Sequence, residues 1–237
     1  MKKSILIGPI SVLATVLAIV SVVHANSYTF TTPLGATDTA GDPVSAEAIF
    51  STSLNTVQVE LINLQANPKD AGQMLSDIFF KLSTGTSGAS LTSSSGGERT
   101  VNSGGTFTDG SVVATGWVRT VISTNELELN GLGGAANTPA HTIIGPPDTT
   151  YSNANASIAG NGPHNPFLFG TSSTPSPVTF ILDVPGALDS TTVFDVVFSF
   201  GTKAGDNVSA VPEPATMLLL GSGLIGIGVY ARKRFKK

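Results

Sequence analysis

The chain has 237 residues, with 12 lysines and arginines, 16 acidic residues and no cysteine. Residues 26–210 hold five of the basic side chains and 15 of the acidic ones, so a net charge of −10 would repel a phosphate backbone and excludes nucleic-acid binding. The lack of cysteine excludes thiol nucleophiles, thiolate metal sites and lipoprotein attachment.

The N-terminus has the pattern of an export signal. Two lysines follow Met1, and residues 5–23 form an almost unbroken apolar run that ends in small residues. This pattern predicts a signal peptide over residues 1–25, which signal peptidase removes after Ala25. A permanent N-terminal anchor is the alternative. Pro9 within the run and the polar residues after Ala25 favour cleavage.

The middle of the chain has the composition of an all-β protein. Short runs of β-branched and aromatic residues alternate with clusters of Gly, Ser and Asn. We therefore predict one β-sandwich domain over residues 26–210, jelly-roll-like and with long polar loops. The expected strands are residues 28–32, 44–51, 57–64, 78–83, 112–122, 126–129, 178–184 and 193–200. The expected turns include residues 85–88, 95–97, 103–105 and 131–134.

Two of these segments carry further expectations. Residues 70–80 have helical spacing, but we favour a strand from Ile78 that a turn or short helix precedes. In residues 193–200, simple alternation places one set of side chains on the buried face: Phe194, Val196, Phe198 and Phe200.

Residues 148–177 are dense in Pro, Gly and Asn, and they are too long for a simple hairpin. We expect Phe167, Leu168 and Phe169 to pin this stretch onto the core. No repeat of fixed period is visible, which favours a single domain.

The histidines and the paired glutamates are the first candidates for chemistry. His141 and His164 lie beside proline-rich loops without ligand spacing, which favours backbone hydrogen bonding over a zinc site. Glu126 and Glu128 would share one face of a strand. Such a pair could serve glycoside hydrolysis, but a solvated acidic face opposite two buried leucines is the simpler interpretation. A Ser/His/Asp triad stays open, because geometry and not sequence order defines it.

Acidic loop residues are the next candidates. Asp38, Asp42 and Asp206 lie in Gly-rich segments and could join backbone carbonyls around Ca²⁺, although neither segment has the twelve-residue EF-hand pattern. Residues 131–136 resemble a dinucleotide loop only weakly, because Pro139 interrupts the helix that it needs. The sequence therefore predicts no catalytic residue, no metal and no cofactor.

Three aromatic residues are candidates for stacking on a sugar. Tyr151 and Phe167 lie in the expected long loop, and Trp117 is the single tryptophan of the chain. A lone strand tryptophan is more often part of the core.

The C-terminus combines three signals. Val211, Pro212, Glu213 and Pro214 come first, and the prolines would leave an extended joint that a protease can reach. The 17 residues from 215 to 231 are apolar and predict a transmembrane helix of roughly 26 Å. The basic end, residues 232–237, includes Arg232, Lys233 and Arg234 and predicts a stop-transfer signal held on the cytoplasmic side.

This arrangement closely resembles the PEP-CTERM sorting tail of exported bacterial proteins. The resemblance implies that exosortase, a membrane-embedded cysteine transpeptidase, cleaves near residues 212–214 and passes the body to the cell surface. Residues 152–207 resemble the bodies of other PEP-CTERM proteins, which implies no activity. An ordinary single-pass anchor is the alternative for residues 211–237.

The sequence thus favours a non-enzymatic structural protein of the cell surface or the exopolysaccharide matrix. Its expected partners are signal peptidase, exosortase, the membrane and exopolysaccharide, with no nucleic acid. A secreted carbohydrate-binding module and a secreted glycoside hydrolase are the alternatives.

Overall fold

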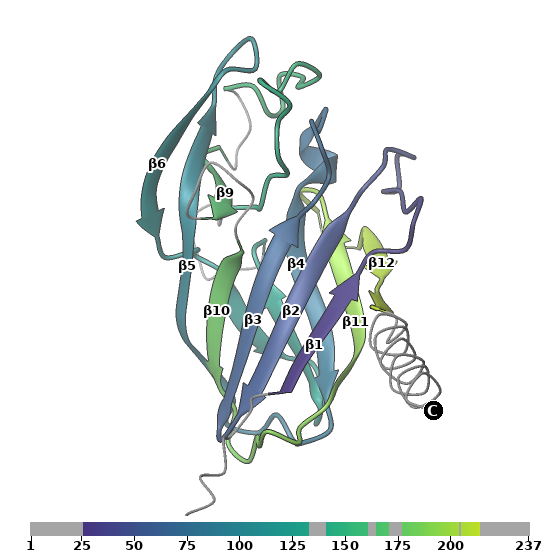
Figure 1. The fold of residues 1–237 in the computed structure, drawn as a ribbon, viewed down its shortest axis with the longest axis vertical. Coiled ribbons are helices and arrows are strands. Elements are labelled where there is room, and N and C mark those ends of the chain that lie inside the picture. Colours follow the sequence, from purple (N-terminus) through teal and green to yellow (C-terminus); the bar gives the residue numbers. More distant parts are fainter. Residues whose placement is uncertain (1–25, 133–140, 161–164, 171–176, 204, 214–237) are drawn as a thin grey trace, which may run out of the picture.

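The structure is a computed structural model that describes residues 26–132, 141–160, 165–170, 177–203 and 205–213. Within these residues the chain is all-β and contains no α-helix. Figure 1 shows two sheets facing each other, with a taller upper part built around β5, β6 and β9. The two-sheet sandwich that the sequence predicts is confirmed, and the jelly-roll-like connectivity stays a prediction. The expected signal peptide and transmembrane helix lie outside the described residues.

Thirteen strands and one short 3-10 helix are described. Their bounds are β1 (Asn26–Thr31), β2 (Ala46–Ser53), β3 (Thr56–Asn63), η1 (Ala71–Gln73), β4 (Leu75–Leu82), β5 (Ser90–Val101), β6 (Phe107–Val113), β7 (Val118–Val121), β8 (Glu126–Asn130), β9 (Phe167–Gly170), β10 (Val178–Asp183), β11 (Val193–Phe200), β12 (Asn207–Ser209) and β13 (Val211–Pro212).

The larger sheet has the order β13-β1-β2-β3-β10-β5-β6, with β9 also paired to β5. The smaller sheet has the order β12-β11-β4-β8-β7. All pairings between the named strands are antiparallel.

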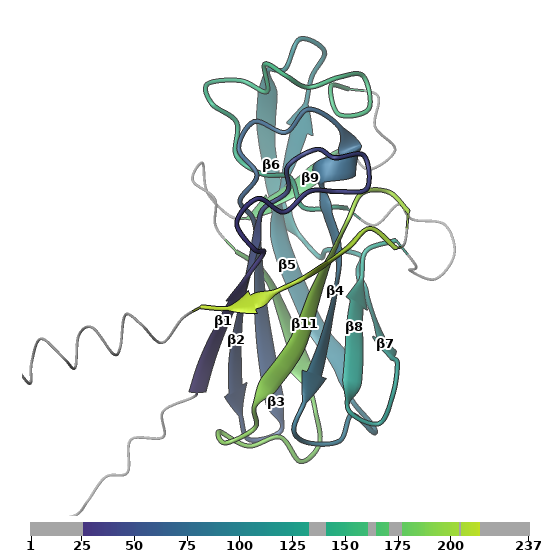
Figure 2. The same ribbon diagram turned by 90° about the vertical axis from the view of Figure 1, so that its right-hand side faces the viewer.

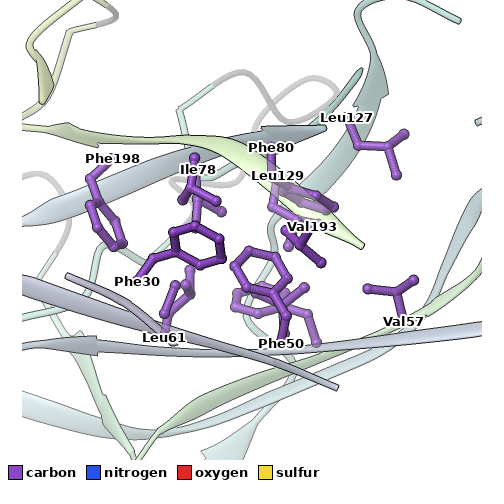
Figure 3. Packing of buried hydrophobic residues seen from close by; sticks show 14 of the residues in the cluster. Phe30, Phe50, Val57, Leu61, Ile78, Phe80, Leu127, Leu129, Val193 and Phe198 are labelled. Atoms are coloured by element: carbon purple, nitrogen blue, oxygen red, sulfur yellow. The ribbon is translucent and has the colours of Figure 1, made fainter. Parts of the chain in front are cut away.

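The core lies between the sheets and is filled by alternate residues of facing strands. In β2 the buried positions are Ala46, Ala48, Phe50 and Thr52, and the residues between them are only half-buried. This period of two is what a strand with one buried face requires. Phe50 meets Phe80 of the opposite sheet with ring centroids 5.0 Å apart (Figure 3).

The strand β11 departs from the simple alternation that the sequence predicts. Asp195 has φ 49°, and the register with β4 shifts between Phe194 and Val197. In a bulge of this kind, two residues of one strand lie opposite a single residue of its partner. The side chains before the bulge therefore face the opposite way from what simple alternation with the later residues predicts. Val193 is therefore buried, whereas Phe194 is only half-buried beside Lys81, and its predicted burial is wrong.

Two other predictions of secondary structure are wrong, and a third is confirmed in part. The predicted turn at residues 95–97 is wrong, because these residues lie within β5, and the predicted strand 112–122 is two strands, β6 and β7. The short helix before β4 is confirmed as η1, although the strand begins at Leu75 and not at Ile78.

The long Pro- and Gly-rich stretch is pinned by three buried residues, Phe167, Leu168 and Phe169, as the sequence predicts. They form β9, which pairs with β5. Two of them, Phe167 and Phe169, belong to a second hydrophobic cluster that also holds Met74, Val101, Ile144, Tyr151 and Ile158. This cluster fills the upper part of the molecule.

A fully buried arginine lies in this upper part. Arg99 has no exposed side chain, and its guanidinium makes two hydrogen bonds to Asp109, at 2.6 and 2.9 Å. The guanidinium carbon lies 4.1 Å from the ring centroid of Phe107 and 3.4 Å from that of Phe169. A paired, stacked arginine avoids the penalty of an uncompensated buried charge.

Candidate functional site

The expected sorting motif begins on the edge of the larger sheet. Val211 lies opposite Thr31, and Pro212 lies opposite Phe30. The backbone N–H of Glu213 donates to the carbonyl oxygen of Thr29 at 3.0 Å. Three of the four motif residues are therefore held by β1, and Pro214 lies outside the described residues.

Proline is compatible with this position for a reason of geometry. Neighbouring residue pairs of an antiparallel ladder alternate between hydrogen-bonded and non-hydrogen-bonded. Because Glu213 bonds to Thr29, the pair Pro212–Phe30 falls at the non-bonded position, where an N–H would point away from β1. Pro212 thus closes the edge without removing a ladder bond.

The chain reaches this edge by crossing from one sheet to the other. β12 pairs with β11 in the smaller sheet, and β13 pairs with β1 in the larger one. The residue between them, Ala210, donates its N–H to Val196 at 2.9 Å. The motif is consequently tied to both sheets by backbone hydrogen bonds.

One carboxyl group faces the motif. Burial, followed by the negative charge of Glu213, raises the pKa of Glu47 above its usual value. Glu47 lies opposite Thr31 on the other side of β1. When both glutamates are ionised, their repulsion therefore opposes the seating of the motif.

A cluster of acidic residues lies at the upper end of the sandwich. Asp38, Asp42 and Asp70 each place a carboxylate oxygen within 4.8 Å of the others. The sequence suggested Asp38 and Asp42 as calcium ligands, and the structure brings these two together with Asp70. Oxygen ligands of this type suit hard cations.

Contacts within the chain already involve each of these carboxylates. The N–H of Asp42 donates to Asp38 at 2.8 Å, and the N–H of Gly72 donates to Asp70 at 2.8 Å. Lys69 pairs with Asp42 at 2.6 Å. These contacts join the loop between β1 and β2 to η1 and support a structural role.

Asp206, the third aspartate in the calcium hypothesis, has different partners. It accepts hydrogen bonds from the backbone N–H of Thr39 at 3.0 and 3.1 Å and from its hydroxyl at 3.1 Å. Thr39 and Asp206 border a cavity of about 360 Å³, which Gly72, Phe200, Gly201, Thr202, Lys203 and Gly205 also line. Asp206 therefore links two loops of the upper end.

The glutamate pair on β8 has the predicted facing but not the predicted exposure. Leu127 and Leu129 are fully buried in the core, as expected. Glu128, however, is only 8% exposed and accepts a hydrogen bond from Asn130 at 2.8 Å, so the expectation of a solvated acidic face is wrong. Glu126 is half-buried.

Glu128 has a buried acidic neighbour that sequence reasoning missed. Asp77 of β4 is 1% exposed, and burial raises its pKa to about 6, with a further contribution from the charge of Glu128. The N–H of Gly131 donates to Asp77 at 3.0 Å. The carboxyl group is thus enclosed by the chain.

The remaining candidates are structural. His141 bonds through Nδ1 to the carbonyl of Pro166, which confirms the backbone role expected of it. Trp117 is 4% exposed, packs on Phe180 at 5.1 Å and donates its indole N–H to the carbonyl of His141 at 2.7 Å. Its predicted core role is confirmed, and His164 lies outside the described residues.

The two aromatic residues of the sugar-stacking hypothesis are also buried. Tyr151 is 1% exposed and Phe167 is fully buried. The hydroxyl of Tyr151 donates to Gly145 at 2.9 Å and accepts from Arg99 at 3.3 Å, and burial raises its pKa to about 12. Neither ring can stack on a saccharide, so the hypothesis that they bind sugar is wrong.

One comparison with known proteins identifies the tail. A family model described as the PEP-CTERM protein-sorting motif matches residues 210–234. The match includes the motif residues 211–214 and the predicted stop-transfer residues 232–234, and it implies export and processing by exosortase. No curated protein and no solved structure matched the chain. In the described part of the chain, no helix has the length and apolarity needed to span a bilayer.

Proposed function

We propose that this chain, which carries a PEP-CTERM sorting motif, is an exported, non-catalytic structural protein of the cell surface or the exopolysaccharide matrix. Signal peptidase removes residues 1–25, the apolar residues 215–231 hold the chain in the membrane, and exosortase cleaves near residues 212–214. The match of the sorting motif to residues 210–234 carries this proposal. The remaining steps follow from the sequence pattern on either side of the motif.

The properties of the body support a structural role. Its two sheets enclose a continuous apolar core, and the candidate residues for sugar stacking are buried within it. The buried carboxyl groups of Asp77 and Glu128 are engaged by neighbouring residues of the chain. These observations favour neither the hydrolase nor the carbohydrate-binding alternative.

The seating of β13 adds a step to the sorting reaction. A protease that binds its substrate as an extended strand forms hydrogen bonds with the backbone N–H and C=O groups, and in β13 these groups are directed toward β1. Val211, Pro212 and Glu213 therefore have to leave the sheet edge before they can enter an active site. The body would control access to its own processing site through the strength of this short pairing.

The test is the intact mass and the fractionation of the protein in its native host, with and without exosortase. We expect a surface-located body that ends near residues 212–214 in the wild type, and an uncleaved chain in membranes without exosortase. The same uncleaved mass in both strains would leave residues 215–231 as a permanent anchor and would contradict the sorting step.

Binding to exopolysaccharide tests the second part of the proposal. A matrix component should sediment with the polymer purified from the host. A carbohydrate-binding module would in addition be displaced by short soluble fragments of that polymer. Such displacement would contradict the purely structural role.

A further inference from the structure

Four exposed apolar side chains lie at the end of the sandwich where β1 begins. Leu54 lies in the turn between β2 and β3, Val121 and Ile122 lie where β7 ends, and Leu188 lies between β10 and β11. Their exposed fractions are 68%, 41%, 47% and 50%. We call these four residues the apolar end. The connections between β2 and β3, between β7 and β8 and between β10 and β11 lie at the bottom of the molecule in Figure 2.

The turns that carry these residues are fastened to one another. The N–H of Asn55 donates to Ala187 at 2.8 Å, and the N–H of Gly186 donates back to the side chain of Asn55 at 2.9 Å. Leu54 and Leu188 consequently line one surface depression of about 540 Å³, together with Ser53, Asp189 and Ser190. The leucines are held side by side.

Charge is nearly absent from the turns at this end. The four connections here, residues 54–55, 83–89, 122–125 and 184–192, contain one charged residue, Asp189. On the neighbouring strand ends lie Asp183, Glu126 and the ion pair of Lys81 with Asp195. The loops of the opposite end hold many more charges, namely Asp38, Asp42, Lys69, Asp70, Asp148, Lys203 and Asp206. The body is thus polarised along its long axis.

The chain leaves the body in the direction of the apolar end. β13 is antiparallel to β1, so each successive residue of the motif pairs with an earlier residue of β1. Asn26, where β1 begins, lies opposite Thr52, two residues before Leu54. At about 3.4 Å per residue, Glu213 is roughly 17 Å along the strand direction from the level of Leu54.

The tether to the membrane is too short to hold the body away from it. In the sequence only Pro214 separates Glu213, the last residue that the structure describes, from the apolar run that begins at Ala215. Two residues can span at most about 7 Å in any conformation, which is less than the distance from Glu213 to the level of Leu54. A chain anchored through residues 215–231 therefore brings this end of the sandwich to the bilayer surface.

We propose that the apolar end rests on the outer face of the bilayer as long as the tail anchors the chain. Leu54, Ile122 and Leu188 enter the boundary between headgroups and acyl chains, as apolar side chains on peripheral proteins do. The partner is the lipid surface itself. Because the connections at this end carry no basic residue, the contact does not depend on anionic lipid. The inference rests on the anchoring step of the proposed function.

The chain is suited to a site-specific test because it has no cysteine. The full-length protein is reconstituted into phosphatidylcholine vesicles that contain nitroxide-labelled lipid, and a fluorophore is attached at Leu54→Cys or Leu188→Cys. Leu34→Cys is the matched control, since Leu34 is fully exposed at the opposite end. We expect quenching at the first two positions to exceed that at the control several-fold, and to persist when salt is raised.

Flotation of the same vesicles separates the two proposals. Chains that float but show equal quenching at all three positions would overturn the contact and leave the anchor intact. Chains that do not float would overturn the anchor and the contact with it. Protection of the labels that depends on protein concentration and not on lipid would assign the apolar end to a second copy of the chain and overturn the proposal.

Discussion

The backbone N–H of Glu213 donates to the carbonyl oxygen of Thr29 at 3.0 Å, so the predicted cleavage site is bonded to the first strand of the body. The alternation of the ladder directs the N–H of Thr31 toward β13 as well, because Thr32 donates to Ala46 of β2. The seating of the motif therefore depends on a few edge hydrogen bonds.

Removing one of these donors should speed processing. Thr31→Pro deletes the N–H that faces β13 and preserves the pairing of β1 with β2. One ladder bond contributes about 1 kcal/mol, so the unpaired population should rise about fivefold. The measurement is the rate of tail removal in the native host. Thr31→Val, which keeps the N–H, should process at the wild-type rate, and equal rates for both variants would contradict the role of the pairing.

A change at Glu47 should have the opposite effect. Burial raises the pKa of Glu47 most, and the charge of Glu213 raises it further. Through the contribution of Glu213, protonated Glu47 favours the seated motif, and this preference is lost as the pH rises through the raised pKa. At neutral pH, Glu47→Gln removes the repulsion of Glu213 and should slow processing. Glu60→Gln on β3 is the control. Faster processing of Glu47→Gln would show that this carboxylate does not oppose the seating of β13.

The buried carboxyl group of Asp77 should make stability depend on pH. Its pKa is raised from 3.8 to about 6, so its contribution is complete below about pH 3.8 and is lost as the pH rises through about 6. The unfolding free energy of Asp77→Asn should therefore rise by about 2–3 kcal/mol relative to that of the wild type as the pH increases from about 3.8 to above 6.

This gain can be measured by urea unfolding of the full chain in detergent, with the fluorescence of Trp117 as the signal. Asp183→Asn is the control, because it removes an exposed carboxylate of β10. A difference between Asp77→Asn and the wild type that stays constant from pH 4 to pH 7 would contradict the assigned pKa.

Removing the carboxylate that pairs with Arg99 should lower the free energy of unfolding more than removing the carboxylate that pairs with a surface lysine. Asp109→Asn leaves a fully buried guanidinium without its counter-ion and should cost about 3 kcal/mol of unfolding free energy. Asp195→Asn removes the partner of the partly exposed Lys81 and should cost less than about 1 kcal/mol. Asparagine also tolerates the left-handed φ of Asp195. Equal losses in urea titrations would contradict the importance of the buried pair.

Alanine substitutions at two adjacent glycines should distinguish the cost of steric crowding from the cost of backbone strain. Gly104 and Gly105 have φ values of 87° and 84°, but a Cβ at Gly105 would lie 2.4 Å from the carbonyl oxygen of Tyr151, and one at Gly104 would meet nothing within 4 Å. Gly104→Ala should cost about 1 kcal/mol. Gly105→Ala should cost clearly more, because it displaces Tyr151. Similar melting temperatures for the two variants would show that Tyr151 moves aside freely.

The sequence predicts the strands with alternating apolar residues well, and it fails where the alternation is weak. β2, β3 and β10 alternate regularly and lie close to their expected positions. β5 contains the run from Ser93 to Gly97, which has the composition of a turn. It is a strand because β10 and β9 pair with it on one side and β6 pairs with it on the other.

The site residues that sequence reasoning missed share one cause. Asp70, Asp77 and Arg99 acquire their roles from residues distant in the chain: Asp70 from the loop of Asp38, Asp77 from Gly131, and Arg99 from Tyr151 and Phe169. Periodicity gives the facing of a side chain on its own strand. It does not give the loop that covers that side chain, and the loop decides whether a carboxylate is solvated or enclosed.

The pairing of β1 with β13 also sets the timing of folding. Thr31 and Val211 are partners, although about 180 residues separate them in the chain. Contacts of such long sequence separation form late, because a large loop must close first. The edge of the larger sheet can therefore be completed only after the last strand has emerged from the export channel, and the chain would cross the membrane before its body is finished.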